Sequence, residues 1–120
     1  MEIIRNYPHD MTGREMYKLI HSPNIRSVKD SVGTIVDVAS FVHYHDEKVN
    51  EDTGEVTTGS VLIFTDESGE TYATNSPYFM REFFGIWDTI RDTGDTDPIS
   101  IEIYEGISKK GRSFKGAILV

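Results

Sequence analysis

The sequence predicts a mainly β domain, a small β-barrel with helices, and three observations indicate it. Five segments between residues 33 and 120 have the alternation or the β-branched and aromatic composition that is typical of strands. One amphipathic helix pattern separates the third of these segments from the fourth. Polar turns that contain glycine join neighbouring strands. We therefore expect one domain over residues 1–120, with residues 1–32 as an N-terminal helical extension and residues 33–120 as the barrel.

Residues 11–20, MTGREMYKLI, predict a short N-terminal helix. Thr12 is the expected N-cap, and Glu15 has the spacing of a capping box, in which two residues satisfy each other's free backbone N–H groups. The sequence HSPN then ends the helix, because the residue before a proline is biased away from helical geometry. Residues 28–31 predict a turn.

Residues 33–45 predict a long first strand, and simple alternation divides its side chains between two faces. One face holds Val36, Val38, Val42 and Tyr44, and the other holds Ile35, Asp37, Ala39, Phe41, His43 and His45. A β-bulge, which is frequent in small barrels, would reverse this assignment partway along the strand. The polar residues 46–56 predict a protruding hairpin connection to a second strand at 57–66, and ESGE then turns into a third at 71–75.

The strongest local signal is the helix that begins at Ser76. Ser76 is the expected N-cap and Pro77 occupies the first helical position. Apolar residues then recur at spacings of three and four and predict one stripe that packs on the sheet: Met80, Phe83, Phe84, Trp87 and Ile90. Tyr78 is expected only to pack or to face solvent. Residues 99–107 predict a fourth strand with its isoleucines inward, and residues 113–120 predict a fifth.

The predicted order is strand, strand, strand, helix, strand, strand, after a short N-terminal helix. This is the order of the oligonucleotide/oligosaccharide-binding (OB) fold, a five-stranded barrel with a helix between its third and fourth strands. The connection between strands four and five flanks the groove that binds nucleic acid in that fold. Its sequence here, SKKGRS, predicts a hairpin turn in which Gly111 adopts a positive φ.

Composition limits the function classes. The formal net charge is −8, and the absence of cysteine excludes disulfides, thiolate zinc sites and a cysteine nucleophile. No apolar run is long enough for a signal peptide or a membrane span, so we expect a soluble, cytoplasmic protein. No nucleophile elbow or phosphate-binding glycine loop is present, and paired carboxylates occur only in predicted turns. We therefore expect no enzyme activity and no cofactor.

The cations are concentrated near the end of the chain. Four of the 12 Lys and Arg residues fall within nine positions: Lys109, Lys110, Arg112 and Lys115. Single-strand binding needs cations that follow phosphates and aromatic faces on which bases stack. The candidate stacking residues, on strands in positions available to an outer face, are Phe41, His43, Phe64, Tyr72 and Tyr104. The alternative is an ordinary solvated turn whose lysines protect an exposed edge from aggregation.

Several segments resemble small single-stranded DNA-binding proteins encoded by phages and mobile elements of Gram-positive bacteria. They are MTGREMYKLIHSP, GTIVDVASF and, above all, YATNSPYFMREF followed by ISIEIYEGISKKGRSF. The resemblance implies a largely sequence-independent protein that coats and protects single strands during phage or mobile-element replication in the bacterial cytoplasm. Single-stranded DNA is then the main partner, with phage or host replication proteins and further copies of the chain as additional ones. Cellular single-stranded DNA-binding proteins that resemble this fold recruit partners through an acidic C-terminal tail; because the sequence ends in its last predicted strand, such recruitment is not expected here.

Two other functions remain open. Clustered acids at 46–55 and 92–97 would suit a protein that mimics nucleic acid and occupies the DNA groove of a host protein. His43 and His45 lie two residues apart on a strand and therefore point to the same side, as metal ligands do in cupin barrels. The other histidines, His9 and His21, lie upstream, so a third strand-borne histidine is missing and no metal is expected.

Overall fold

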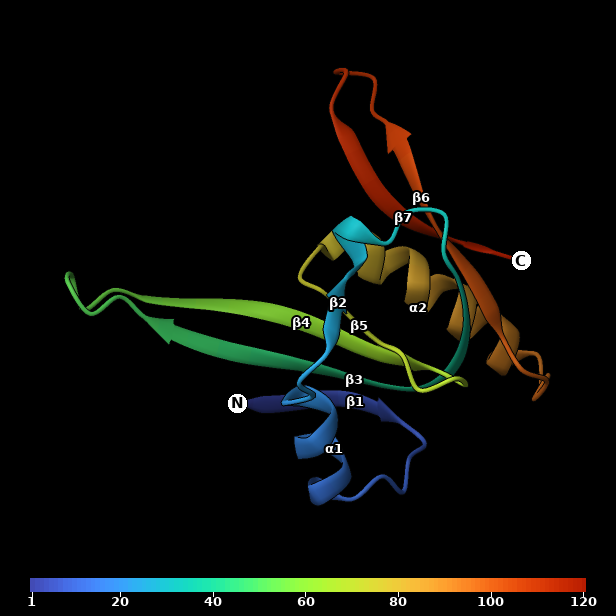
Figure 1. Ribbon diagram of the computed structural model, residues 1–120, viewed down its shortest axis with the longest axis horizontal. Helices are drawn as coiled ribbons and strands as arrows, with labels where there is room; N and C mark the ends of the chain where they lie inside the picture. Colours follow the sequence, from blue (N-terminus) through green and yellow to red (C-terminus); the bar gives the residue numbers. More distant parts are fainter.

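The computed structural model describes all 120 residues and is mainly β (Figure 1). Its elements are β1 (Glu2–Tyr7), α1 (Gly13–Ile20), β2 (Ile25–Ser27), the 3₁₀ helix η1 (Val28–Asp30), β3 (Ile35–Val49), β4 (Val56–Asp66), β5 (Thr71–Thr74), α2 (Pro77–Asp92), β6 (Ser100–Ile107) and β7 (Ser113–Leu119). The predicted succession of three strands, a helix and two strands is confirmed by β3 to β7. The N-terminal segment, expected to contribute only a helix, also supplies β1 and β2.

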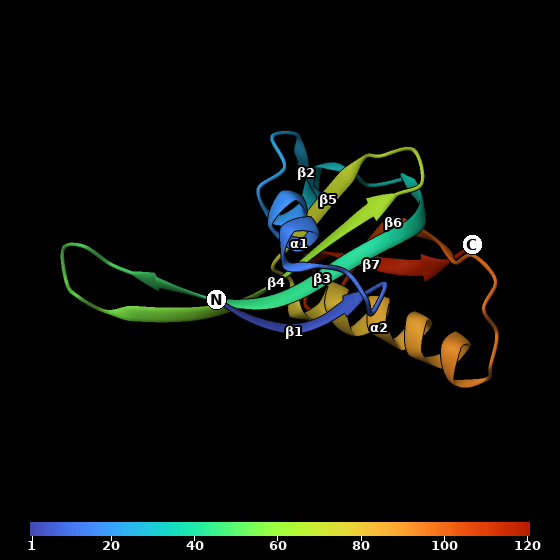
Figure 2. The ribbon, with the colours of Figure 1, turned by 90° about the horizontal axis from the view of Figure 1, so that it is seen from below.

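The strands form one curled sheet in the order β2-β5-β4-β3-β6-β7, with β1 beside β3. All neighbours are antiparallel except β2 and β5. β3 is the centre of the sheet, because its first residues pair with β6 while its later ones pair with β4 and β1. The sheet curls around α2 as a half-barrel, and its two end strands, β2 and β7, are not paired with each other (Figures 1 and 2).

A β-bulge changes which side chains of β3 enter the core. The register with β4 shifts between Val38 and Ser40. After the bulge, Phe41 joins Val36 and Val38 in the main core, whereas Val42 and Tyr44 belong to the cluster on the opposite face. The single face predicted for the three valines and Tyr44 is therefore wrong beyond the bulge, since one extra residue reverses the parity of a strand.

Two apolar cores lie on opposite sides of the β3–β4 pair. The larger packs under α2, where Met80, Phe83 and Trp87 are buried as the helix stripe predicts, and Phe84 and Ile90 lie half-buried at its margin. The smaller lies under α1 (Figure 2). Because α1 covers one face and α2 the other, the middle of β4 is buried on both sides and shows no alternation.

The predicted helix caps are confirmed. The Thr12 hydroxyl accepts a hydrogen bond from the Glu15 amide at 3.1 Å, and the Glu15 carboxylate accepts one from the Thr12 amide at 3.2 Å. The Ser76 hydroxyl accepts one from the Phe79 amide at 3.2 Å, with Pro77 as the first residue of α2. Such caps satisfy backbone N–H groups that the first helical turn leaves free, and each contributes about 1 kcal/mol.

Two hairpins project from the body of the molecule (Figure 1). One is the acidic arm, residues 46–59, formed by the ends of β3 and β4; the other is the basic hairpin, residues 107–115, formed by β6 and β7. Gly111 has φ +79°, as predicted for the turn of the basic hairpin. Neither helix has the length and apolar character that crossing a membrane would require.

Candidate nucleic-acid interface

The basic hairpin presents its charges to solvent. Lys109, Lys110 and Arg112 are exposed, and none of them forms an ion pair. Lys115 is more enclosed and lies 3.7 Å from a carboxylate oxygen of Glu105. Hydrogen bonds between the Ser108 amide and the Arg112 carbonyl, and between the Gly111 amide and the Ser108 carbonyl, close the turn at 2.8 and 2.9 Å. The hairpin therefore holds three cations that are available to an anionic ligand.

Three predicted stacking residues are in the core instead. Phe41, Phe64 and Tyr72 are only 1%, 0% and 5% exposed. They form one row across β3, β4 and β5, and the Phe64 ring stacks between Tyr72 and Phe79 with centroids 5.5 and 5.8 Å away. The expectation that these rings occupy an outer face is wrong, because the bulge turns Phe41 inward and its register partners face α2 with it. Their rings are not accessible to a base.

Tyr104 lies at the border of the core, where its ring crosses Gly116. A Cβ atom on Gly116 would lie 2.7 Å from the Tyr104 ring and overlap the Glu82 carboxylate, so only glycine leaves room for this crossing. The Tyr104 hydroxyl donates a hydrogen bond to Glu82 Oε1 at 2.9 Å. Burial, followed by hydrogen bonding to Tyr78 and Glu82, raises the pKa of Tyr104 well above its ordinary value. Tyr104 is thus held in place by α2 and is only partly available to a ligand.

Two aromatic side chains that the sequence analysis did not select lie beside the basic hairpin. Tyr78, in the first turn of α2, is 36% exposed, and its ring centroid is 4.8 Å from that of Phe114 on β7. The Arg81 guanidinium lies 5.3 Å from the Tyr78 ring centroid. Phe114 covers Gly106 on the neighbouring strand, where a Cβ atom would collide with the ring. The position of Phe114 directly after the basic turn is the only sequence signal that could have found this pair.

Three hollows meet at Asn75, the exposed residue between β5 and α2. The first, about 450 Å³, leads toward the basic hairpin; the second, about 560 Å³, lies between β4 and α2; the third, about 280 Å³, leads toward the acidic arm. The first hollow is lined by Ser27, Lys29, Ser113, Phe114 and Lys115. The second is lined by His43, Ser60, Met80, Arg81 and Phe84. The third is lined by Tyr44, Asp46, Lys48, Thr57 and Val61. We call this continuous surface the Asn75 groove.

The Asn75 groove is cationic although the whole protein is acidic. Lys29, Lys48 and Arg81 line it without forming ion pairs, and Lys115 lies where the groove meets the basic hairpin. Asp46 is its only acidic residue. Because charges farther apart than a Debye length of about 8 Å are largely screened at physiological salt, the local surplus decides what the groove attracts. The groove can therefore bind a polyanion.

His43 also lines the Asn75 groove, as a half-buried side chain. Neither of its ring nitrogens has a hydrogen-bond partner, and its ring centroid is 5.2 Å from that of Phe84. Burial, and then the nearby charges of His45 and Arg5, lower the pKa of His43 below its ordinary value of 6.5. The His45 ring lies 6.2 Å away, but no group of three or more His, Cys, Asp or Glu side chains could hold a metal ion. The structure thus offers no support for the metal-site alternative.

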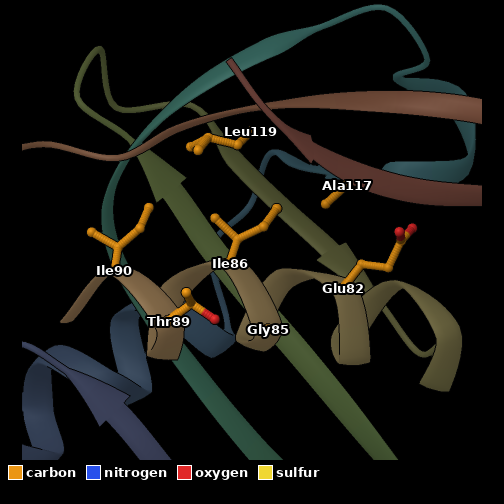
Figure 3. A pocket seen from close by; sticks show the side chains of 7 residues that line it. All are labelled: Glu82, Gly85, Ile86, Thr89, Ile90, Ala117 and Leu119. Carbon is orange, nitrogen blue, oxygen red and sulfur yellow. The ribbon is translucent and has the colours of Figure 1, made fainter. Parts of the chain in front are cut away.

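A further hollow between α2 and β7 has a different chemistry. Ile86 and Ile90 of α2 point toward Leu119 and Ala117 of β7 across about 400 Å³ (Figure 3). Glu82 is the only charged residue in its lining, and its carboxylate already accepts the Tyr104 hydroxyl. Such an apolar and negatively charged hollow does not suit a phosphate backbone.

No family model, no curated protein and no solved structure matches the chain. The candidate interface is therefore defined by its own geometry alone: the basic hairpin, the Tyr78–Phe114 pair and the Asn75 groove.

Proposed function

We propose that this chain is a largely sequence-independent single-stranded DNA-binding protein with an OB fold. The observation that carries the proposal is the Asn75 groove, where the unpaired cations Lys29 and Arg81 lie close to the exposed ring of Tyr78 and the half-buried ring of Phe114. The strand pairing supports the fold assignment, because β3, β4 and β5 form a meander, α2 follows it, and β6 returns to pair with β3 before the β7 hairpin. The proposed setting is the coating and protection of single strands during phage or mobile-element DNA replication in the host cytoplasm.

The proposed mechanism uses different residues for phosphates and bases. Lys109, Lys110 and Arg112 contact the backbone at one end of the groove, and Lys29 continues the charge toward its middle. Bases stack on Tyr78 and Phe114, and each stacked base contributes about 1–3 kcal/mol. Stacking and phosphate contacts depend little on base identity, so the affinity varies little with sequence.

The same groove favours single strands over a duplex. An aromatic ring can stack on a base only when the base face is free, and in a duplex both faces are covered by neighbouring base pairs. The cations alone would not distinguish a single strand from a duplex, whereas the Tyr78–Phe114 pair adds affinity for the single strand only.

A titration with labelled DNA tests the proposal. A fluorescein-labelled oligothymidine of about 30 bases is titrated with protein at low salt and at physiological salt, with a duplex of equal length as the comparison. The single strand should bind more tightly than the duplex, and its affinity should fall as salt rises. Absence of binding at low salt would contradict the proposal.

The acidic arm favours a second candidate function, the mimicry of nucleic acid. It projects from the body and carries five carboxylates against one cation: Asp46, Glu47, Glu51, Asp52 and Glu55 against Lys48. A mimic would bind the DNA-contacting surface of a host protein and would have no affinity for DNA at any ionic strength. The titration above therefore separates the two candidates.

A further inference from the structure

The acidic arm has an apolar patch on one face of its two-stranded ribbon. Val49 on β3 and Val56 on β4 lie directly opposite each other, and they are 61% and 54% exposed. The neighbouring residues Asn50 and Glu55 are joined by a backbone hydrogen bond of 2.8 Å, so the valines form a non-hydrogen-bonded pair, in which side chains lie closer together. The two valines therefore form one continuous apolar surface that the rest of the chain leaves open.

Negative charges surround this patch. Glu51, Asp52 and Glu55 lie in the turn beyond the valines, and Asp46 and Glu47 lie on the other side of them. None of these carboxylates forms an ion pair within the chain. A surface that fits the arm must therefore offer an exposed apolar side chain with unpaired cations around it.

The basic hairpin has this chemistry. Ile107, the last residue of β6, is 76% exposed, more than any other large apolar residue of the chain. The turn that follows it holds Lys109, Lys110 and Arg112, which are exposed and form no ion pair. Like the arm, the hairpin is a two-stranded ribbon. It is thus complementary to the arm in charge and matches its apolar patch.

The arm and the hairpin of one molecule do not meet. They project from the body in different directions, and no ion pair joins them (Figure 1). The complement of each must therefore lie on another copy of the chain. Such a contact joins two different surfaces and is heterologous, so each copy can give its arm to one neighbour and accept the arm of another.

We propose that the acidic arm of one copy docks on the basic hairpin of a second copy, with the Val49–Val56 pair against Ile107 and the arm carboxylates against the three cations of the turn. The proposal goes beyond the proposed function and does not depend on DNA binding. Exposed ion pairs are individually weak and are screened by salt, so the association should be weak and should need low salt. Titrations with DNA at low protein concentration therefore concern separate copies.

Sedimentation equilibrium of the whole protein at high concentration gives the first test. At low salt the average mass should exceed the 13.6 kDa of one chain, and it should return to that value as salt rises. Net charge alone predicts the opposite, because copies with a formal charge of −8 repel each other most strongly at low salt. The mass of a single chain at low salt would overturn the proposal.

Two variants test whether the arm and the hairpin are the surfaces that meet. The arm variant, Val49→Lys, Val56→Lys, replaces the apolar patch with cations. The hairpin variant, Lys109→Glu, Lys110→Glu, reverses two charges of the turn. Each variant alone should remain a single chain at low salt. Their mixture should form pairs and nothing larger, because the intact arm of the hairpin variant can dock on the intact hairpin of the arm variant.

Matched controls make the same changes outside both hairpins. Val32→Lys, Ile118→Lys replaces two apolar residues that are 44% and 52% exposed. Arg14→Glu, Lys18→Glu reverses two exposed cations of α1 that form no ion pair. Both controls should associate as the original protein does. If they lose association as the arm and hairpin variants do, the contact is not specific and the proposal is overturned.

The outcomes separate this contact from strand binding. If the arm and hairpin variants associate as strongly as the original protein, or if their mixture forms no pairs, the proposal is overturned whether or not the chain binds DNA. If the mixture forms pairs but no oligonucleotide binds the original protein, the contact between copies stands and the proposed function fails. Formation of pairs also shows that both variants are folded, since each supplies one intact surface.

Discussion

Neutralising two lysines of the basic hairpin gives the sharpest test of how the groove attracts DNA. In the double variant Lys109→Gln, Lys110→Gln, two exposed cations that form no ion pair are removed from the turn. Both side chains lie outside the core, so the free energy of unfolding should change by less than about 0.5 kcal/mol. The loss should therefore appear in binding alone.

The size of the loss follows from counterion release. For single strands, the logarithm of the binding constant falls with the logarithm of the salt concentration by about 0.7 for each phosphate contacted. If each lysine contacts one phosphate, the slope becomes less steep by about 1.4 in the double variant. Between about 1 M and about 0.15 M salt, one such contact contributes about fourfold in affinity, and two contribute about fourteenfold.

The assay is the anisotropy titration with labelled oligothymidine, repeated at several salt concentrations. The matched control is Arg14→Gln, Lys18→Gln, which removes two exposed, unpaired cations from α1 and leaves the same net charge. The control should lose less than about twofold in affinity, because distant charges are screened at physiological salt. Equal losses in both double variants would show that net charge, rather than the hairpin, sets the affinity. An unchanged slope in the hairpin variant would show that these two lysines contact no phosphate.

Three further predictions concern the framework that positions the interface. Gly116→Ala should destabilise the protein by about 1–3 kcal/mol in urea unfolding, because its Cβ would collide with Glu82 and the Tyr104 ring; a stability equal to that of the original protein would show that Tyr104 does not cross this glycine. Phe64→Ala should cost about 3–5 kcal/mol of stability, because the ring is fully buried, and the remaining folded protein should bind single strands with unchanged affinity; a stable variant with weak binding would restore Phe64 as a stacking residue. The pKa of His43, measured by NMR, should lie below 6.5, and the unfolded chain should therefore bind a proton first as the pH falls, so stability should decrease from about pH 6.5 downward. The His43→Phe variant should lose less stability over that range, and an equal loss in both proteins would count against the assignment.

The sequence predicted the features that depend on neighbours along the chain. The capping box at Thr12, the N-cap at Ser76 and the positive φ of Gly111 are set by local chemistry, and the structure contains all three. The apolar stripe of α2 was equally visible, because helical spacing places its residues on one face. The order of the elements from β3 to β7 followed from the same local patterns, whereas β1 and β2 were not predicted.

The face of the sheet on which each side chain lies was harder to predict. Parity placed Phe41 opposite Val36 and Val38, but the bulge after Val38 brings all three into one core. Nothing in the alternation marks the bulge, since a single inserted residue changes only the residues that follow it. In β4, burial on both faces removes the alternation altogether, so Phe64 could not be assigned to a side from sequence.

The candidate interface depends on contacts between distant parts of the chain. Tyr78 and Phe114 meet only because the first turn of α2 packs beside β7. The Asn75 groove likewise exists because β5 ends before the free part of β4, leaving an edge that no strand covers. The basic hairpin was visible in sequence as a charge cluster, but its stacking partners required the tertiary structure.

The place where the strand binds can be mapped by ¹H–¹⁵N NMR of the labelled protein with and without oligothymidine, at low salt. The perturbed amides should cluster around Asn75 and Tyr78 and along residues 107–115, with residues 13–20 of α1 unaffected. Perturbations confined to α1 or to the hollow between α2 and β7, or no perturbation at all, would contradict this interface.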